Sequence, residues 1–163
     1  MKLKVLALSI VLACGLTGCV TVDGVFGEVD PQISAVELEA LQTREFEASV
    51  TDAFAATIGA FQSYGYTIQS ADRDTGIVIA KTTSNASLNQ LIGLTRVEYD
   101  KANAFIEPSS AGHVKIRISI VKHVSATGAY GGGGEKEAMR TKPKVYQDLF
   151  TKIEQSLFMR KNL

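Results

Sequence analysis

One segment of the chain alternates apolar and polar side chains, and it limits the possible folds more than any other feature. Residues 113–124 place His, Lys, Arg and Ser between four branched apolar residues, which are Val114, Ile116, Ile118 and Ile120. Successive side chains of a β-strand point to opposite faces of the sheet. The alternation therefore predicts a strand with one face against a core and the other toward water or a partner, as in an antiparallel sheet.

Two other segments carry apolar residues at helical spacing. The first follows Ser49, a residue type favoured as an N-cap, and ends at Gly65; its stripe is Val50, Phe54, Ile58 and Phe61. The second begins at Pro143, which suits the first position of a helix; its stripe is Val145, Leu149, Ile153 and Leu157. Both segments are predicted to be amphipathic helices packed on a sheet.

The remaining elements are predicted from short apolar runs and the turn residues between them. We expect a first edge strand at 41–46, a hairpin of strands 66–70 and 77–82, and a long strand at 95–106 that ends in a turn at 107–112. Residues 84–93 are expected to form a long loop with one helical turn, and Tyr130 with Gly131–Gly134 a mobile loop. A capping-box pattern at Ser34–Glu37 allows a short helical turn through Leu41.

This order of elements predicts an α+β fold of two layers. The economical packing is a curved antiparallel sheet of four to five strands, with two helices on one face. We expect a single domain at residues 41–163, preceded by a tether at residues 19–40.

Three segments of this predicted domain resemble known proteins. They are Leu41–Phe46, Tyr64–Ile68 with Asp72 and Gly76–Val78, and Val145–Phe150 with Gln155–Phe158. Together they resemble a group of small bacterial outer-membrane lipoproteins of unknown function. The G-Y-x-I and D-x-x-x-G-x-I patterns are also similar to the helix-grip domains of BamC-type lipoproteins of the outer-membrane β-barrel assembly machinery. The resemblance implies a helix-grip-like fold over most of residues 41–163 and carries no catalytic motif.

The first eighteen residues have the organisation of a secretory signal. Lys2 and Lys4 precede an apolar run, residues 5–13, that is too short to cross a hydrocarbon layer of about 30 Å as a helix. The run ends in Leu16-Thr17-Gly18-Cys19, which resembles the lipobox of bacterial lipoproteins. We therefore expect cleavage after Gly18 and attachment of lipid to Cys19.

Three further expectations concern Cys19 and the residues near it. In Val11-Leu12-Ala13-Cys14 a bulky leucine stands where a small residue is preferred, so Cys14 is interpreted as part of the apolar run and no disulfide is expected in the mature chain. Several acyl chains give stable anchoring, since each buried methylene contributes about 0.8 kcal/mol. Val20 occupies the position where an aspartate would favour the inner membrane of enteric-type bacteria, so we expect the outer membrane, with the domain facing the periplasm.

Charge and reactive residues exclude several classes of function. Loss of Lys2 and Lys4 leaves 15 basic and 17 acidic residues, a net charge of −2, which argues against a nucleic-acid partner. His113 and His123 share a strand face but lie about 33 Å apart at ~3.3 Å per residue, too far to bind one metal ion. Asp72 and Asp74 are explained by a turn, and the glycine run lacks the lysine of a phosphate-binding loop. We expect no catalytic residues, no metal site and no cofactor.

Two functions remain open. The first is a non-enzymatic interaction module in the cell envelope, whose polar sheet face, edge strand or glycine loop binds a partner protein. The second is a periplasmic carrier of an apolar ligand held between the helices and the sheet. The apolar residues barely suffice to seal a core, and a large cavity would leave them under-packed. The interaction module is therefore the favoured hypothesis.

Overall fold

The protein is an α+β structure built on one large, open antiparallel sheet. The computed structural model describes residues 30–89, 93–129 and 131–162. The helices are α3 (Ala35–Gln42), α4 (Val50–Ser63) and α5 (Pro143–Lys161). The strands are β1 (Thr43–Glu47), β2 (Tyr66–Asp72), β3 (Ile77–Thr82), β4 (Asn85–Asn89), β5 (Leu94–Ser110), β6 (His113–Gly128) and β7 (Gly133–Met139).

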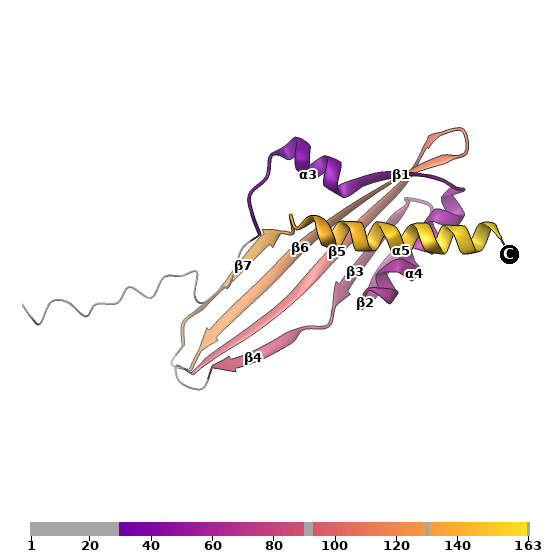
Figure 1. The fold of residues 1–163 in the computed structure, drawn as a ribbon. Coiled ribbons are helices and arrows are strands. Elements are labelled where there is room, and N and C mark those ends of the chain that lie inside the picture. The colour runs from indigo at the N-terminus through magenta and orange to yellow at the C-terminus, as the bar shows by residue number, and fades with distance from the viewer. Residues whose placement is uncertain (1–29, 90–92, 130, 163) are drawn as a thin grey trace, which may run out of the picture.

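The spine of the sheet is the hairpin of β5 and β6, which have 17 and 16 residues. The two strands are paired from Leu94 opposite Gly128 to Ser110 opposite His113. The other strands are short and flank this hairpin, and the main path through the seven-stranded sheet is β1-β6-β5-β3-β2. Figure 1 shows the two long strands running diagonally through the molecule.

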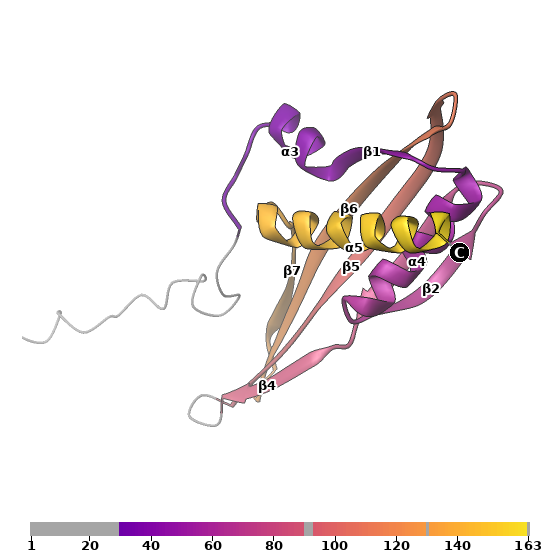
Figure 2. The same ribbon diagram turned by 45° about the vertical axis from the view of Figure 1, so that its right-hand side comes forward.

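Each long strand pairs with two short strands in succession along its outer edge. β1 pairs with residues 113–117 of β6 and β7 with residues 121–127. On the other side, β3 pairs with residues 101–105 of β5 and β4 with residues 94–98. The sheet thus has two halves, and in Figures 1 and 2 the half that holds β4 and β7 extends beyond the helices. We call this half, which consists of β4, β7 and residues 94–100 and 121–128, the arm.

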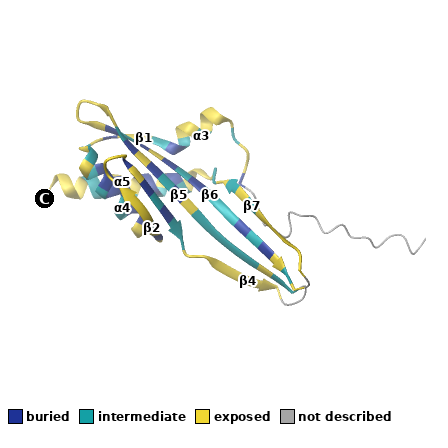
Figure 3. Ribbon diagram, turned by 180° about the vertical axis from the view of Figure 1, so that it is seen from behind, coloured by how far each residue is buried: buried dark blue, intermediate teal, exposed yellow. Residues whose placement is uncertain are grey.

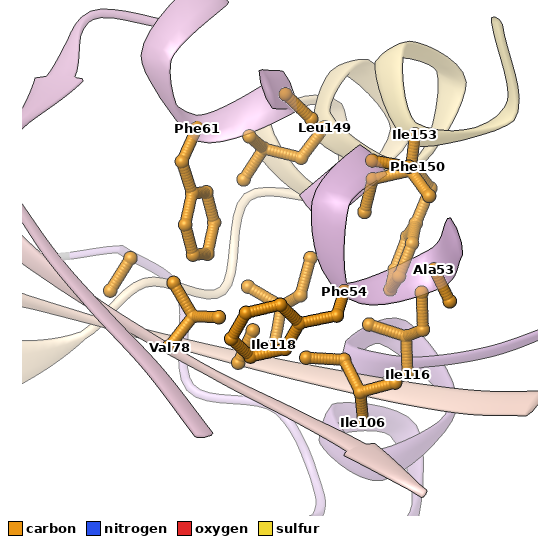
Figure 4. Packing of buried hydrophobic residues seen from close by; sticks show 14 of the residues in the cluster. Ala53, Phe54, Phe61, Val78, Ile106, Ile116, Ile118, Leu149, Phe150 and Ile153 are labelled. Carbon is orange, nitrogen blue, oxygen red and sulfur yellow. The ribbon is translucent and has the colours of Figure 1, made fainter. Parts of the chain in front are cut away.

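The hydrophobic core lies between the other half of the sheet and the helices α4 and α5. Ile116 and Ile118 of β6 are fully buried, together with Phe61 of α4 and Leu149 and Ile153 of α5. Figure 4 shows these side chains converging from the two helices and the sheet. The predicted orientation of the β6 side chains and the apolar stripes of both helices are therefore confirmed.

The ends of the helices follow the chemistry expected from the sequence. Ser49 caps α4, since its hydroxyl accepts a hydrogen bond of 3.1 Å from the Asp52 amide. Pro143 is the first residue of α5, and Ser34 and Glu37 form the predicted capping box at the start of α3. Helix α3 begins in the predicted tether and extends the expected short turn to Gln42, so Leu41 and Gln42 are helical and the first strand begins at Thr43 instead of Leu41.

The predicted number of elements was wrong. The expectation was four to five strands and two helices, whereas the sheet has seven strands and the described residues include three helices. Residues 85–89, expected in a loop, form β4, because β5 begins at Leu94 and offers them a long partner. The pairing of neighbouring strands outweighs the weak strand propensity of the sequence Asn-Ala-Ser-Leu-Asn.

The expected loop of four glycines was also wrong in part. Gly133 and Gly134 belong to β7 and pair with Thr127 and Ala126, while Tyr130 lies outside the described residues. A Cβ atom on Gly133 would overlap the backbone oxygen of Ala126. The strand β7 therefore needs a glycine at this position to approach β6.

Ile118→Asp is expected to unfold the protein. The side chain is fully buried, and an unpaired buried charge costs at least about 3 kcal/mol of the free energy of unfolding. Ser119→Asp, on the opposite sheet face, is the matched control and should leave thermal unfolding by circular dichroism nearly unchanged. A folded Ile118→Asp variant would show that the core is not where the structure places it.

Gly133→Ala is expected to lower the free energy of unfolding by about 1–3 kcal/mol, because the added methyl group must displace the backbone of β6. Gly59→Ala is the control, since its Cβ meets no atom within 4 Å and the site lies inside α4. That change should instead stabilise the protein by about 0.5–1 kcal/mol. Chemical denaturation of both variants measures the contrast, and equal effects would contradict the β6–β7 pairing.

Candidate interaction surface

The helices α4 and α5 cover one face of the sheet, and on this face charged side chains appear where the arm begins. Under the helices this face is apolar, with Ala102 and Ala104 of β5 and Ile120 of β6 fully buried. Two residues further toward the arm on each strand, and on the same face, lie Asp100 of β5 and its partner Lys122 of β6. On β5 the apolar side chains of this face give way to charged ones where the helices stop covering the sheet, whereas on β6 Val124 and Ala126 remain apolar and are only 5% and 3% exposed.

Two ion-pair groups occupy this face of the arm. Glu98 lies 2.8 Å from Arg96 and 3.2 Å from Lys122. Arg140 lies 3.0 Å from Asp100 and 3.6 Å from Asp30, whose side chain is only 3% exposed. The second group fixes the start of the described chain beside the junction between β7 and α5.

The pKa of Glu98 is held below its ordinary value. Partial burial raises the pKa, but the hydrogen bond and charge of Lys122, with the charge of Arg96, outweigh it and stabilise the carboxylate. The carboxylate of Glu98 therefore contributes stability above its ordinary pKa, and that contribution is lost as the pH falls through the lowered pKa.

The opposite sheet face, which we call the open face, is covered by none of the helices among the described residues and is seen in Figure 3. Four side chains, one from each of four strands, lie in a row there, which we call the stacked row. The Lys81 ammonium lies 3.7 Å from the Tyr99 ring centroid, and the rings of Tyr99 and His123 stack at 4.7 Å. His123 in turn lies 2.9 Å from Glu137. This row links β3, β5, β6 and β7 where the arm begins.

The open face has a few exposed apolar side chains, of which two are adjacent. Ile77 and Phe105 lie directly opposite each other on β3 and β5 and are about two-fifths exposed. Met139 of β7 is similarly exposed. Scattered exposed apolar side chains are ordinary on protein surfaces, so they do not define a binding site without further features.

The edge strands of the sheet differ in whether their side chains discourage pairing with another strand. β1 carries Arg44, Glu45 and Glu47, and β7 carries Glu135, Lys136 and Glu137. β2 has a bulge between Ile68 and Ser70 and ends in Asp72. β4 has neither a charge nor a proline, and all five of its residues are exposed. Charges, bulges and prolines are the usual features that prevent another strand from pairing with an edge.

A surface cleft of about 620 Å³ lies away from the arm, between the end of α5, the strand β1 and the start of α4. Phe46, Ala48 and Leu157 contribute its apolar part, and Phe158 at its rim is 70% exposed. Glu47, Asp52, Arg160 and Lys161 also line it. The cleft lies beside the layer between helices and sheet, which is filled by the core side chains.

The structure places the residues considered for chemistry in separate surroundings. Cys19, the predicted lipid attachment site, lies outside the described residues. His113 is exposed and its Nδ1 lies 3.2 Å from the Ala111 oxygen, whereas His123 belongs to the stacked row. Asp72 accepts a hydrogen bond of 2.9 Å from the Asp74 amide, as its predicted turn requires. The strand β4 and the stacked row were missed, although the absence of charge in residues 82–95 was visible in the sequence.

Comparison with known proteins matches the chain to no protein-family model and to no curated protein sequence. Among the described residues, no helix has the length and hydropathy needed to cross a bilayer. The same residues contain no group of three or more histidine, cysteine or acidic side chains arranged to hold a metal ion.

Glu98→Gln is expected to reduce the loss of stability as the pH falls from the ordinary pKa of a glutamate through the lowered pKa of Glu98, because protonation of that carboxylate contributes to the loss. Lys122→Met removes a partner of the carboxylate and should act in the same direction. Denaturant titrations across this pH range measure the effect. Acid profiles identical to that of the wild type in both variants would show that the Glu98 group contributes nothing.

Proposed function

We propose that the protein is a bacterial lipoprotein that acts as a non-enzymatic interaction module in the cell envelope. Lipid on Cys19 holds it to a membrane, the outer membrane being favoured by Val20, and the domain faces the periplasm. The architecture is helix-grip-like, with α4 and α5 on one face of the sheet and the arm added beyond them. The observation that carries the proposal is the arm, whose open sheet and uncharged edge strand suit recognition of another polypeptide.

The position of Asp30 supports an anchor close to the arm. Asp30 accepts a hydrogen bond of 3.0 Å from the Thr141 amide and pairs with Arg140, so the chain enters the domain at the base of the arm. Eleven residue steps separate Cys19 from this point, and they span at most about 40 Å when fully extended. A lipid on Cys19 would therefore keep the arm near the bilayer and near other envelope proteins.

A carrier of an apolar ligand is the second candidate. The layer between helices and sheet, where the ligand was expected, is occupied by fully buried side chains such as Phe61, Ile118 and Leu149. The observation in its favour is the cleft beside β1 and the end of α5, which includes Phe46 and Leu157. Its charged lining makes it less suited to a purely apolar molecule than to a mixed one.

Cys19→Ser is expected to abolish incorporation of labelled palmitate and to release the protein from the membrane fraction. Cys14→Ser is the matched control and should leave labelling unchanged. Envelope crosslinking followed by affinity purification then compares the partners of the wild type and of the unlipidated variant, with enrichment expected only for the wild type. Palmitate labelling that persists in Cys19→Ser, or turnover of a substrate by the purified protein, would refute the proposal.

A further inference from the structure

The uncharged edge strand β4 is the feature that the proposed function leaves without an assigned partner. No charged residue occurs from Thr82 to Thr95 or from Val124 to Gly134, whereas 21% of the whole chain is charged. Leu88 is 61% exposed at this edge. Because β4 offers no charged side chain with which an opposite charge could pair, an uncharged strand suits this edge best.

The strand β4 itself meets this description. It reads Asn85-Ala86-Ser87-Leu88-Asn89, and it is nearly symmetric about its central residue. When two copies pair antiparallel about Ser87, an amide side chain faces an amide, Ala86 faces Leu88, and Ser87 faces its own equivalent. No like charges are then opposed, and the opposed hydroxyl and amide side chains are able to form hydrogen bonds across the two strands.

We propose that two copies of this chain pair through β4, antiparallel, across a twofold axis at Ser87. The two arms then form one sheet in the order β7-β6-β5-β4-β4-β5-β6-β7. This contact is isologous and closes on itself, so it gives a dimer. Pairing of β4 with β7 of another copy would not close, and it would place Glu135, Lys136 and Glu137 against the uncharged edge.

The small contact area indicates that the dimer forms on a membrane and not in dilute solution. Two five-residue strands bury far less than the roughly 1,200 Å² of a standard stable interface. The dimer is therefore weak in dilute solution and forms when both copies are concentrated on one membrane. Its strength, though not its geometry, rests on the lipid anchor of the proposed function.

Ser87→Cys in the full-length protein tests the axis directly. In native membranes treated with a mild oxidant, the two copies of position 87 face each other across the strand pair, at a separation that a disulfide can bridge. We expect a disulfide-linked dimer on non-reducing gels. Thr67→Cys, exposed on the edge strand β2, is the matched control and should remain monomeric, and the wild type controls for the native cysteines.

The register is tested with two further variants. Asn85→Cys and Asn89→Cys should crosslink to each other when they are co-expressed, and neither should form a comparable dimer alone. Leu88→Lys added to Ser87→Cys places a charge at the edge and should lower the dimer yield severalfold. Because Leu88 is exposed, this variant should keep the thermal unfolding of the wild type, which excludes misfolding as the cause.

Several results would overturn the pairing. Equal crosslinking at positions 67 and 87 would indicate random collision, and crosslinking of position 87 to a different envelope protein would indicate another occupant of the edge. The second result would leave the proposed function intact. Conversely, an 87–87 disulfide without palmitate on Cys19 would support the pairing and refute the anchoring.

Discussion

The pairing of β5 with β6 along their entire lengths is the constraint on which the rest of the structure depends. The two strands have 17 and 16 residues, whereas α5 has 19 residues and rises only about 1.5 Å per residue. A strand rises about 3.4 Å per residue, so the hairpin is roughly twice as long as the helix that covers it. A part of the sheet must therefore lie beyond the helical layer, and that part is the arm.

The side chains of the hairpin follow this division. Where α4 and α5 cover the sheet, the inner face carries Ala104, Ile116 and Ile118 and excludes water. Beyond the helices, the same face carries ion pairs around Glu98 and Arg140 beside the buried Val124 and Ala126. The open face is linked across four strands by Lys81, Tyr99, His123 and Glu137. The arm is thus ordered by strand pairing, polar contacts and two small buried apolar side chains, and β4 lies exposed at its edge.

The sequence could predict those helices and strands whose own residues have the capping, proline or alternation pattern typical of that element. The cap at Ser49, the proline at position 143 and the alternation from Val114 to Ile120 each depend on local chemistry, and each is confirmed. β4 and β7 could not be predicted in this way, since Asn-Ala-Ser-Leu-Asn and Gly-Gly-Glu-Lys-Glu-Ala-Met lack β-branched residues. They are strands because β5 and β6 extend far enough to pair with them. The lack of charge in residues 82–95 was visible, but its meaning as an open edge required the pairing of β4 with β5. The lipid anchor, by contrast, stays a prediction from the sequence.

Hydrogen exchange of the backbone amides tests the account most directly, because every step rests on the arm being a preformed sheet. The amides that join residues 94–100 of β5 to residues 121–128 of β6 are expected to exchange about as slowly as those under the helices. Peptides from these segments can be followed by mass spectrometry in the full-length protein. Slow exchange along the whole hairpin is the predicted result. Exchange of the arm segments at the rate of an unstructured chain would contradict the account, since no ordered edge would then exist for a partner to recognise.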